Sequence, residues 1–457
     1  MELWQQKGGE AMKTKMNHLM NMLLIVATLL GFTACANDDP HEGEGGVAIA
    51  LDNSRCPNVT IRHTYLYIYD TGGNLCAAYD YADAHAVASA LLPLEAGHYT
   101  VAVVINADEA PTETATQTAL HEWAAAKIGI DGDMLSGMAE VDVTGNRVVR
   151  VTIPLYQDAF PLPVLSVRFI MPETGMADFT PQDTKTRAAA AGYTLRCVAE
   201  LYKAGTDQIV LHKAITPELQ ADGTYKVELQ LSEGDYDLRL WADYARTEAQ
   251  LADVFYHTQS LKAVTLFTDP YTANTDAKDV AYGNESGITL PKAGATITLP
   301  LQRPLAKYRI IVDADEIAEY QEMRKVNPQE FPPIEELTVS VQYEGYFPSG
   351  FNVSTEKPND AVVGMGYSGS LSHYDSSAAE LELGSDWILV NGNTSFVNAT
   401  VIVSDSQGNV ICRIPGTQID YRRNQLTTVK GLFLTSGANS GGIRIDTEWD
   451  GVYDVWF

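Results

Sequence analysis

Apolar and polar residues alternate along most of the chain after residue 46. Val47, Ile49 and Leu51 are separated by smaller or polar residues, which gives the two-residue period of a β-strand. This pattern recurs to the end of the chain, while the 3.6-residue helical period is rare. The sequence therefore predicts an all-β protein.

Three segments predict β-hairpins, because two alternating runs flank a turn rich in Asp, Gly, Asn or Gln. They are Tyr65–Tyr79 (YLYIYDTGGNLCAAY), Ala199–Ala214 and Val401–Ile414. A second element also repeats: Leu94–Asp108 and Leu231–Ala245 share the pattern Leu-x-x-Gly-x-Tyr followed by alternation, and Leu381–Val390 is a looser copy. In each copy the glycine permits a turn and the alternating residues predict a strand.

A third repeated element ends the first two units. Val151–Gln157 (VTIPLYQ) resembles Ile297–Arg303 (ITLPLQR), and the proline inside each predicts an edge strand or a bulge. The recurrence of these elements indicates serial β-domains of ordinary size, which we place at residues 47–160, 161–302 and 303–457.

Few helices are expected. The best candidates are Thr118–Gly129 and Asp313–Lys325. The second has acidic residues in its first turn and basic residues in its last turn, which suits the helix dipole.

The first 34 residues have the features of an export signal. A weakly basic start precedes the apolar run Met22–Phe32, which is too short to span a bilayer and has the length of a signal-peptide core. Thr33-Ala34-Cys35 resembles a bacterial lipobox, in which the cysteine becomes the lipidated first residue of the mature chain. The alternative is an ordinary signal peptide with an incidental cysteine. Residues 35–46 are acidic and glycine-rich, which predicts a flexible tether.

The charge balance excludes one class of partner. The net charge of −28 makes binding to the phosphates of nucleic acids unfavourable. It suits a solvated surface protein but identifies no ligand.

The remaining cysteines leave two interpretations open. Outside the cytoplasm, Cys56 and Cys76 could form a disulfide within the first unit. The alternative is that both are thiols in strands, as expected for Cys197 and Cys412, which lie in alternating runs.

Motifs of catalysis are missing from the sequence. The nine histidines are scattered, and no zinc-protease, nucleophile-elbow or phosphate-loop motif occurs. The tetrad Ser354–Lys357 formally matches S-x-x-K, but Pro358 disfavours the helix that this chemistry needs. We therefore expect no enzyme activity, no metal site and no cofactor. Trp241, Trp387 and Trp449 are assigned to the core in preference to a glycan-binding platform.

The order of these pieces resembles the fimbrillin superfamily, and within it the fimbrial anchor or minor-subunit lipoproteins of Bacteroidota. The resemblance is carried by Cys35, Leu51–Pro57, the Tyr65–Leu75 hairpin, Leu94–Ile105 and Pro300–Asp313. It extends weakly over most of residues 35–457, and the third unit departs from the usual two-domain pattern. It implies transthyretin-like Greek-key sandwiches, export to the outer membrane surface as a lipoprotein, and assembly with other fimbrial subunits by strand exchange.

The resemblance also implies roles for the ends of the chain. In polymerising members an arginine-specific protease removes the first strand, which here is Val47–Leu51 with Arg55 just after it. The last segment alternates and ends on Trp456-Phe457, so Val452, Val455, Trp456 and Phe457 are candidates for a donor strand, the alternative being a last core strand.

The sequence thus predicts a lipid-anchored cell-surface fimbrial subunit of anchor, accessory or adhesive type, with a host molecule or glycan as a candidate ligand. Two alternatives are a polymerising stalk subunit cut after Arg55 and a surface glycan-binding lipoprotein that serves nutrient uptake.

Overall fold

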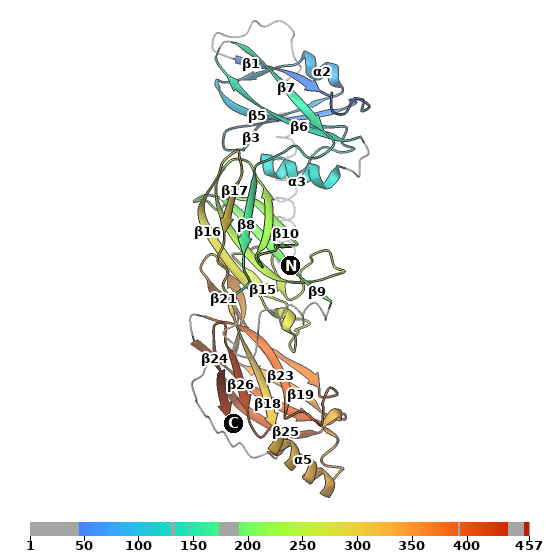
Figure 1. The fold of residues 1–457 in the computed structure, drawn as a ribbon, viewed down its shortest axis with the longest axis vertical. Helices are drawn as coiled ribbons and strands as arrows, with labels where there is room; N and C mark the ends of the chain where they lie inside the picture. The colour runs from blue at the N-terminus through green and yellow to red at the C-terminus, as the bar shows by residue number, and fades with distance from the viewer. Residues whose placement is uncertain are drawn as a thin grey trace, which may run out of the picture.

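The computed structural model is an elongated column of three β-sandwiches that follow one another along its long axis (Figure 1). It describes residues 45–128, 133–145, 147–172, 192–391 and 394–436, and the backbone of residues 452–456. The all-β prediction with few short helices is confirmed.

The first sandwich is a sheet of order β3-β2-β5-β6-β7-β1-β4 that divides into two layers. β6 and β7 pair only at Ser136–Tyr156 and Gly137–Leu155, and the core lies between the two layers. Its elements are β1 (Gly45–Asp52), β2 (Thr64–Tyr69), β3 (Leu75–Tyr81), α2 (Ala84–Ser89), β4 (Leu91–Leu94), β5 (Gly97–Ile105), α3 (Gln117–Lys127), β6 (Leu135–Val143) and β7 (Val148–Tyr156).

The second sandwich repeats this arrangement. Its sheets have the orders β10-β9-β13-β16 and β11-β12-β8-β17, and its first strand, β8, lies parallel to its last, β17, as β1 does to β7. The hairpin and the Gly-x-Tyr strand occupy equivalent places in both units, so the predicted repeat is confirmed for these two. The strands are β8 (Val164–Phe169), β9 (Tyr193–Lys203), β10 (Ile209–Ile215), β11 (Glu218–Leu219), β12 (Tyr225–Gln230), β13 (Gly234–Arg246), β16 (Ala281–Leu290) and β17 (Ala295–Thr298).

The third sandwich has sheets of order β23-β18-β26-β27 and β22-β19-β24-β25. Its first strand, β18, again lies parallel to β26. Its elements are β18 (Leu305–Asp313), α5 (Ala314–Val326), η2 (Ile334–Glu336), β19 (Thr338–Glu344), β20 (Tyr346–Asn352), β21 (Lys357–Val363), β22 (Gly366–Ser370), β23 (Glu380–Leu389), β24 (Thr394–Ser404), β25 (Val410–Arg422), β26 (Leu426–Lys430) and β27 (Val452–Trp456).

The predicted third copy of the repeat was assigned to the wrong strands. The predicted Gly-x-Tyr copy, β23, pairs with the first strand β18, whereas β5 and β13 pair with the hairpin strands β2 and β9. The hairpin β24–β25 likewise occupies the later position in the sandwich. The reason is an insertion: β20 and β21 separate β19 from its neighbour β22, so the early hairpin is not continuous in sequence.

The inserted strands form a small sheet that joins the second and third sandwiches. β14 (Tyr256–His257) and β15 (Val264–Leu266) come from the connection between β13 and β16, and the sheet order is β14-β15-β20-β21. Phe351 of β20 lies 6.1 Å from the Trp241 ring and 4.9 Å from the Tyr282 ring, between centroids. One apolar cluster therefore runs without a break from the second unit into the third.

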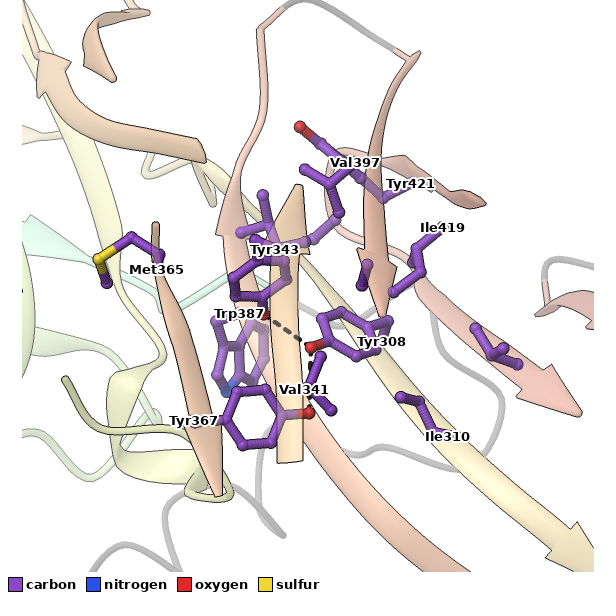
Figure 2. Close-up of a cluster of buried hydrophobic side chains, with 14 of the residues drawn as sticks. Tyr308, Ile310, Val341, Tyr343, Met365, Tyr367, Trp387, Val397, Ile419 and Tyr421 are labelled. Atoms are coloured by element: carbon purple, nitrogen blue, oxygen red, sulfur yellow. Dashed lines mark hydrogen bonds between the residues drawn. The ribbon is translucent and has the colours of Figure 1, made fainter. Parts of the chain in front are cut away.

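A tyrosine cluster lies in the part of this core that belongs to the third sandwich. The Tyr308 hydroxyl is 2.6 Å from that of Tyr343 and 3.0 Å from that of Tyr367, and Trp387 packs beside them (Figure 2). All four residues are buried.

Buried ion pairs reinforce the same boundary. Arg303 contacts both carboxylate oxygens of Asp279 at 2.6 and 3.0 Å, and both side chains are 2 % exposed. Arg303 also donates to Asn424 and to the Pro172 carbonyl, which ties three distant segments together.

The first and second units meet through polar contacts. Lys292 pairs with Glu140, Lys213 with Glu122, and the Thr118 and Ser232 hydroxyls lie 3.4 Å apart. Within the described residues, no apolar cluster contains strand residues of both units.

The two segments predicted as proline-containing edge strands have different positions. β17 is an edge strand but ends at Thr298, before Pro300, whereas β7 contains Pro154 and lies between β1 and β6, so the edge prediction was wrong for β7. Pro154 sits where β7 changes partner: residues up to Pro154 pair with β1, and Leu155 and Tyr156 pair with β6. A missing N–H costs little at such a change of partner.

Both predicted helices form. Thr116 caps α3 by accepting from the Ala119 N–H, and Asp313 caps α5 by accepting from the Glu316 N–H. The short helix α2 was not predicted, because six residues carry too little periodicity to detect.

We predict that Asp279→Ala destabilises the second and third sandwiches together. The substitution leaves the Arg303 guanidinium buried without its carboxylate, which costs about 3–5 kcal/mol in comparable sites. Urea unfolding followed by hydrogen exchange would show parallel loss of protection in β13 and β18. Lys226→Ala, which removes the more exposed contact to Glu228, is the control and should change stability by less than about 1 kcal/mol. Loss of protection in β13 alone would contradict a shared core.

Candidate functional site at the first strand

Strand β1 lies inside its layer, between β4 on one side and β7 on the other. It is antiparallel to β4 from Gly45–Leu94 to Ala48–Leu91, and parallel to β7 from Gly46–Val148 to Asp52–Pro154. Val47 and Ile49 are 0 % and 3 % exposed and belong to the core of the first sandwich. The strand therefore satisfies two neighbouring backbone edges and fills the core beneath them.

The turn after β1 presents Arg55 to solvent. Its backbone is held by the Ser54 N–H, which donates to the Asp52 carboxylate, and by the Cys56 N–H, which donates to the Asn53 carbonyl. The bond from the Ser54 backbone also lowers the pKa of Asp52. The exposed Arg55 guanidinium lies over the Tyr156 ring, 4.7 Å from its centroid. A basic residue is thus accessible between the first strand and the rest of the sandwich.

Loss of β1 would leave a slot with defined chemistry. The facing edges of β4 and β7 would lose their hydrogen-bond partners, and the core around Val47 and Ile49 would open. A strand that runs as β1 does, parallel to β7 and with apolar residues at alternate positions, would satisfy such a slot.

The structure does not contain the disulfide considered for Cys56 and Cys76. Both are free thiols, as are Cys197 and Cys412. Cys56 is buried, with its sulfur 3.9 Å from the Leu155 carbonyl oxygen, whereas Cys76 is exposed, with its sulfur 3.7 Å from the Asn74 carbonyl oxygen. The two side chains occupy different environments, because β3 alternates its faces and directs residue 76 outward. Cys197 and Cys412 are buried, as predicted for core residues.

The C-terminal candidate strand pairs within its own chain. β27, which contains Val452, Val455 and Trp456, lies parallel to β26 from Leu426–Val452 to Lys430–Trp456. It forms the outer edge of its sheet. Phe457 and Trp449 lie outside the described residues, as does the predicted lipid site Cys35.

A buried carboxylate holds the segment that leads toward this strand. Glu316 of α5 accepts from the Leu434 N–H at 2.5 Å and from the Thr435 N–H at 3.1 Å. Burial raises its pKa to about 7 despite these bonds. Its second oxygen is buried without a hydrogen-bond partner in the described part of the chain.

Sequence reasoning missed the buried charges at the boundary of the second and third units. Lys278 and Asp386 form a pair whose side chains are 2 % and 0 % exposed. One signal was available, since Asp386 interrupts the otherwise apolar end of β23. Trp241 and Trp387 are core residues, as predicted.

Two further features bear on function. Among the described residues, no cluster of His, Cys, Asp and Glu is arranged to hold a metal ion. In that same part of the chain, none of the helices has the length and apolar character needed to cross a membrane.

We predict that Glu316 makes stability depend on pH. Its folded pKa lies above the unfolded value near 4.5, so its contribution is fully present below about pH 4.5 and is lost as pH rises through 7. Relative to Glu316→Gln, the wild type should lose roughly 2–4 kcal/mol of unfolding free energy between pH 4.5 and pH 8. Denaturant titrations of both proteins across this range measure the difference. An unchanging difference would show that Glu316 titrates normally.

Comparison with known proteins gives one family and a group of similar structures. No curated protein matches the chain. Solved structures similar to it include the fimbrial anchor protein Mfa2 from Porphyromonas gingivalis, with 13 % identity over 55 % of this chain and 82 % of that one, and a TM-score of 0.29.

Two others are a fimbrial assembly protein from Parabacteroides distasonis and the tip fimbrial protein Mfa3 from Porphyromonas gingivalis. The first has 9 % identity over 60 % of this chain and 92 % of that one, with a TM-score of 0.31. The second has 10 % identity over 59 % and 94 %, with a TM-score of 0.29.

The family match covers the second and third sandwiches. Residues 166–455 match the model of a family of unknown function, DUF6562. This span begins inside β8 and ends inside β27, and it contains the whole of the shared core. The chain belongs to the DUF6562 family.

Proposed function

We propose that this protein is a non-enzymatic, lipid-anchored subunit of fimbrial type on the outer surface of the cell. In this role it is an anchor, accessory or adhesive component that binds other subunits by strand exchange. The observation that carries the proposal is the position of β1. It is an N-terminal strand that fills a core, and it is joined to the rest of its sandwich through an exposed arginine turn.

The column supports the same role. A lipid on Cys35 would place the first sandwich next to the membrane, because the tether of residues 35–46 leads directly into β1. The third sandwich, with α5 at its end, would then face away from the cell (Figure 1). Such an orientation suits a component that joins a membrane to partners outside it.

The anchor and stalk roles differ in the fate of β1. An anchor keeps β1 and its lipid, so the slot in its first sandwich stays filled. It then exchanges strands with other subunits at another of its sandwiches. A stalk subunit loses β1 after Arg55 and accepts a strand from a neighbour. In the second case β27 is the natural donor, because it lies parallel to its neighbour β26, as β1 lies parallel to β7.

We predict that the surface form begins at a lipidated Cys35. Cys35→Ser should release the protein from the membrane fraction, and Arg55→Ala should leave both its amount and its N-terminus unchanged. Arg62→Ala, which alters another exposed arginine, is the matched control. N-terminal sequencing and membrane fractionation are the measurements. A mature chain that starts at Cys56, and that disappears in Arg55→Ala, would establish the stalk role instead.

A second candidate function, saccharide binding, is favoured by a hollow at the end of the third sandwich. The cavity of about 320 Å³ is lined by Gln321, Arg324, Lys325, Glu335 and Tyr374, among others. The partly exposed Tyr374 ring, beside amide and guanidinium donors, is suited to a sugar, particularly one with a carboxylate.

We predict that, if the hollow is a saccharide site, the full chain binds a carboxylated glycan on an array and Arg324→Ala loses that binding. The control is Arg413→Ala, which changes a basic residue elsewhere in the third unit. If the wild type binds no glycan, the saccharide function is wrong and the fimbrial role stands without it. If Arg324→Ala binds as well as the wild type, the saccharide site is not this hollow.

A further inference from the structure

Lys278 and Asp386 approach each other inside the core shared by the second and third sandwiches. Lys278 ends η1 (Asp276–Lys278), and Asp386 lies on β23. The Lys278 Nζ is 2.6 Å from Asp386 Oδ1, and the two side chains are 2 % and 0 % exposed. The amine and the carboxyl group are therefore in contact and almost free of solvent.

Hydrogen-bond donors surround the carboxyl group. The Tyr271 and Tyr343 hydroxyls donate to Asp386 Oδ2 at 2.5 and 2.7 Å, and the Trp387 backbone N–H donates to Oδ1 at 2.8 Å. The Tyr343 hydroxyl in turn belongs to the tyrosine cluster around Tyr308 (Figure 2). These contacts hold the carboxyl group in one orientation.

Tyr271 contacts both partners. Its hydroxyl lies 3.0 Å from the Lys278 Nζ as well as 2.5 Å from Asp386 Oδ2. A phenol in this place can exchange protons with the nitrogen and with the carboxyl group. No other described side chain bridges the pair in this way.

Burial makes the ionised form of this pair costly. Two charges without water are stable only through each other, and transfer of one proton from the ammonium to the carboxylate removes both. Burial also lowers the pKa of the Lys278 amine. The products of the transfer, a neutral amine and a carboxylic acid in contact, are the reactants of amide formation.

We propose that Lys278 and Asp386 form an intramolecular isopeptide bond. The Nζ lone pair attacks Asp386 Cγ, and negative charge collects on Oδ2, where the Tyr271 and Tyr343 hydroxyls stabilise it. Oδ1 carries the proton received from the lysine and takes a second proton from the nitrogen, which lies 2.6 Å from Oδ1 in the unlinked pair. It then leaves as water. One C–N bond forms, one C–O bond breaks, and no oxidant or cofactor is needed.

The bond would join the connection after the second sandwich to a strand of the third. The shared core would then be closed covalently as well as by packing. In a column that connects a membrane to external partners, this link would carry tension across the boundary without depending on the weaker contacts around it.

The structure offers an internal control. Lys307 Nζ and Asp276 Oδ1 are also 2.6 Å apart, but their side chains are 9 % and 13 % exposed. This pair has the same contact distance and less complete burial. It should stay unlinked if exclusion of water and fixed donors drive the reaction.

The test is peptide mapping of the full chain after denaturation. We expect a branched peptide that joins the segments around Lys278 and Asp386, lighter than the two segments by one water. Lys278→Ala and Asp386→Ala should lack it and should migrate more slowly on a denaturing gel. Asp386→Asn should form the same link with loss of ammonia in place of water.

The role of Tyr271 has its own readout. Tyr271→Phe keeps the ring and removes the hydroxyl, so linkage should form at least about tenfold more slowly after synthesis. Folded wild-type protein that yields a free Lys278 amine and an unmodified Asp386 would overturn the proposal. Equal linkage at Lys307–Asp276 would overturn the assigned roles of burial and of the phenols.

Discussion

The packing of Phe351 against Trp241 and Tyr282 is the contact on which the association of the second and third sandwiches depends. Phe351 belongs to an insertion in the third sandwich, and its aromatic partners belong to the second. Large aromatic side chains bury much area at a small entropic cost, so a few of them can fix the orientation of two domains. The small sheet β14-β15-β20-β21 holds this contact in place by pairing strands from both units. The second and third sandwiches therefore behave as one body, which agrees with the extent of the family match.

A second constraint is common to all three units. In each sandwich the first strand lies parallel to a late one: β1 to β7 and β8 to β17, the last strands of their units, and β18 to β26, the last strand but one. Because the paired strands run in the same direction, the chain enters each unit at one end and leaves it at the other, and the connections from β7 to β8 and from β17 to β18 are short. In all three units this first strand lies inside its sheet, with a neighbouring strand on each side.

Local chemistry explains how much of this fold was predictable. The turns at Asp70–Asn74 and Asp405–Asn409 are closed by the aspartate side chain, which accepts backbone N–H groups two and four residues later, so both hairpins could be predicted. Strand partners were harder. β23 has the sequence pattern of β13 yet pairs with the first strand of its unit, because long-range packing decides partners and sequence pattern does not. The exposed position of Arg55 after the first strand was predictable, because it depends on local sequence. Lys278 and Asp386 were not, since 108 residues separate them and only the tertiary fold brings them together.

The polar boundary between the first and second sandwiches has a mechanical consequence. Its ion pairs are partly exposed: Lys292 and Glu140 are 64 % and 32 % exposed, and a cavity of about 230 Å³ lies beside them. Physiological salt screens such charges over about 8 Å, so the stiffness of this joint depends on ionic strength. The boundary between the second and third sandwiches does not depend on it in this way, because it is an apolar core. The second and third sandwiches therefore move together, and the boundary between the first and second sandwiches is where the column bends. The column can reorient in flow, more readily at high than at low ionic strength, without any change in the domains that it connects.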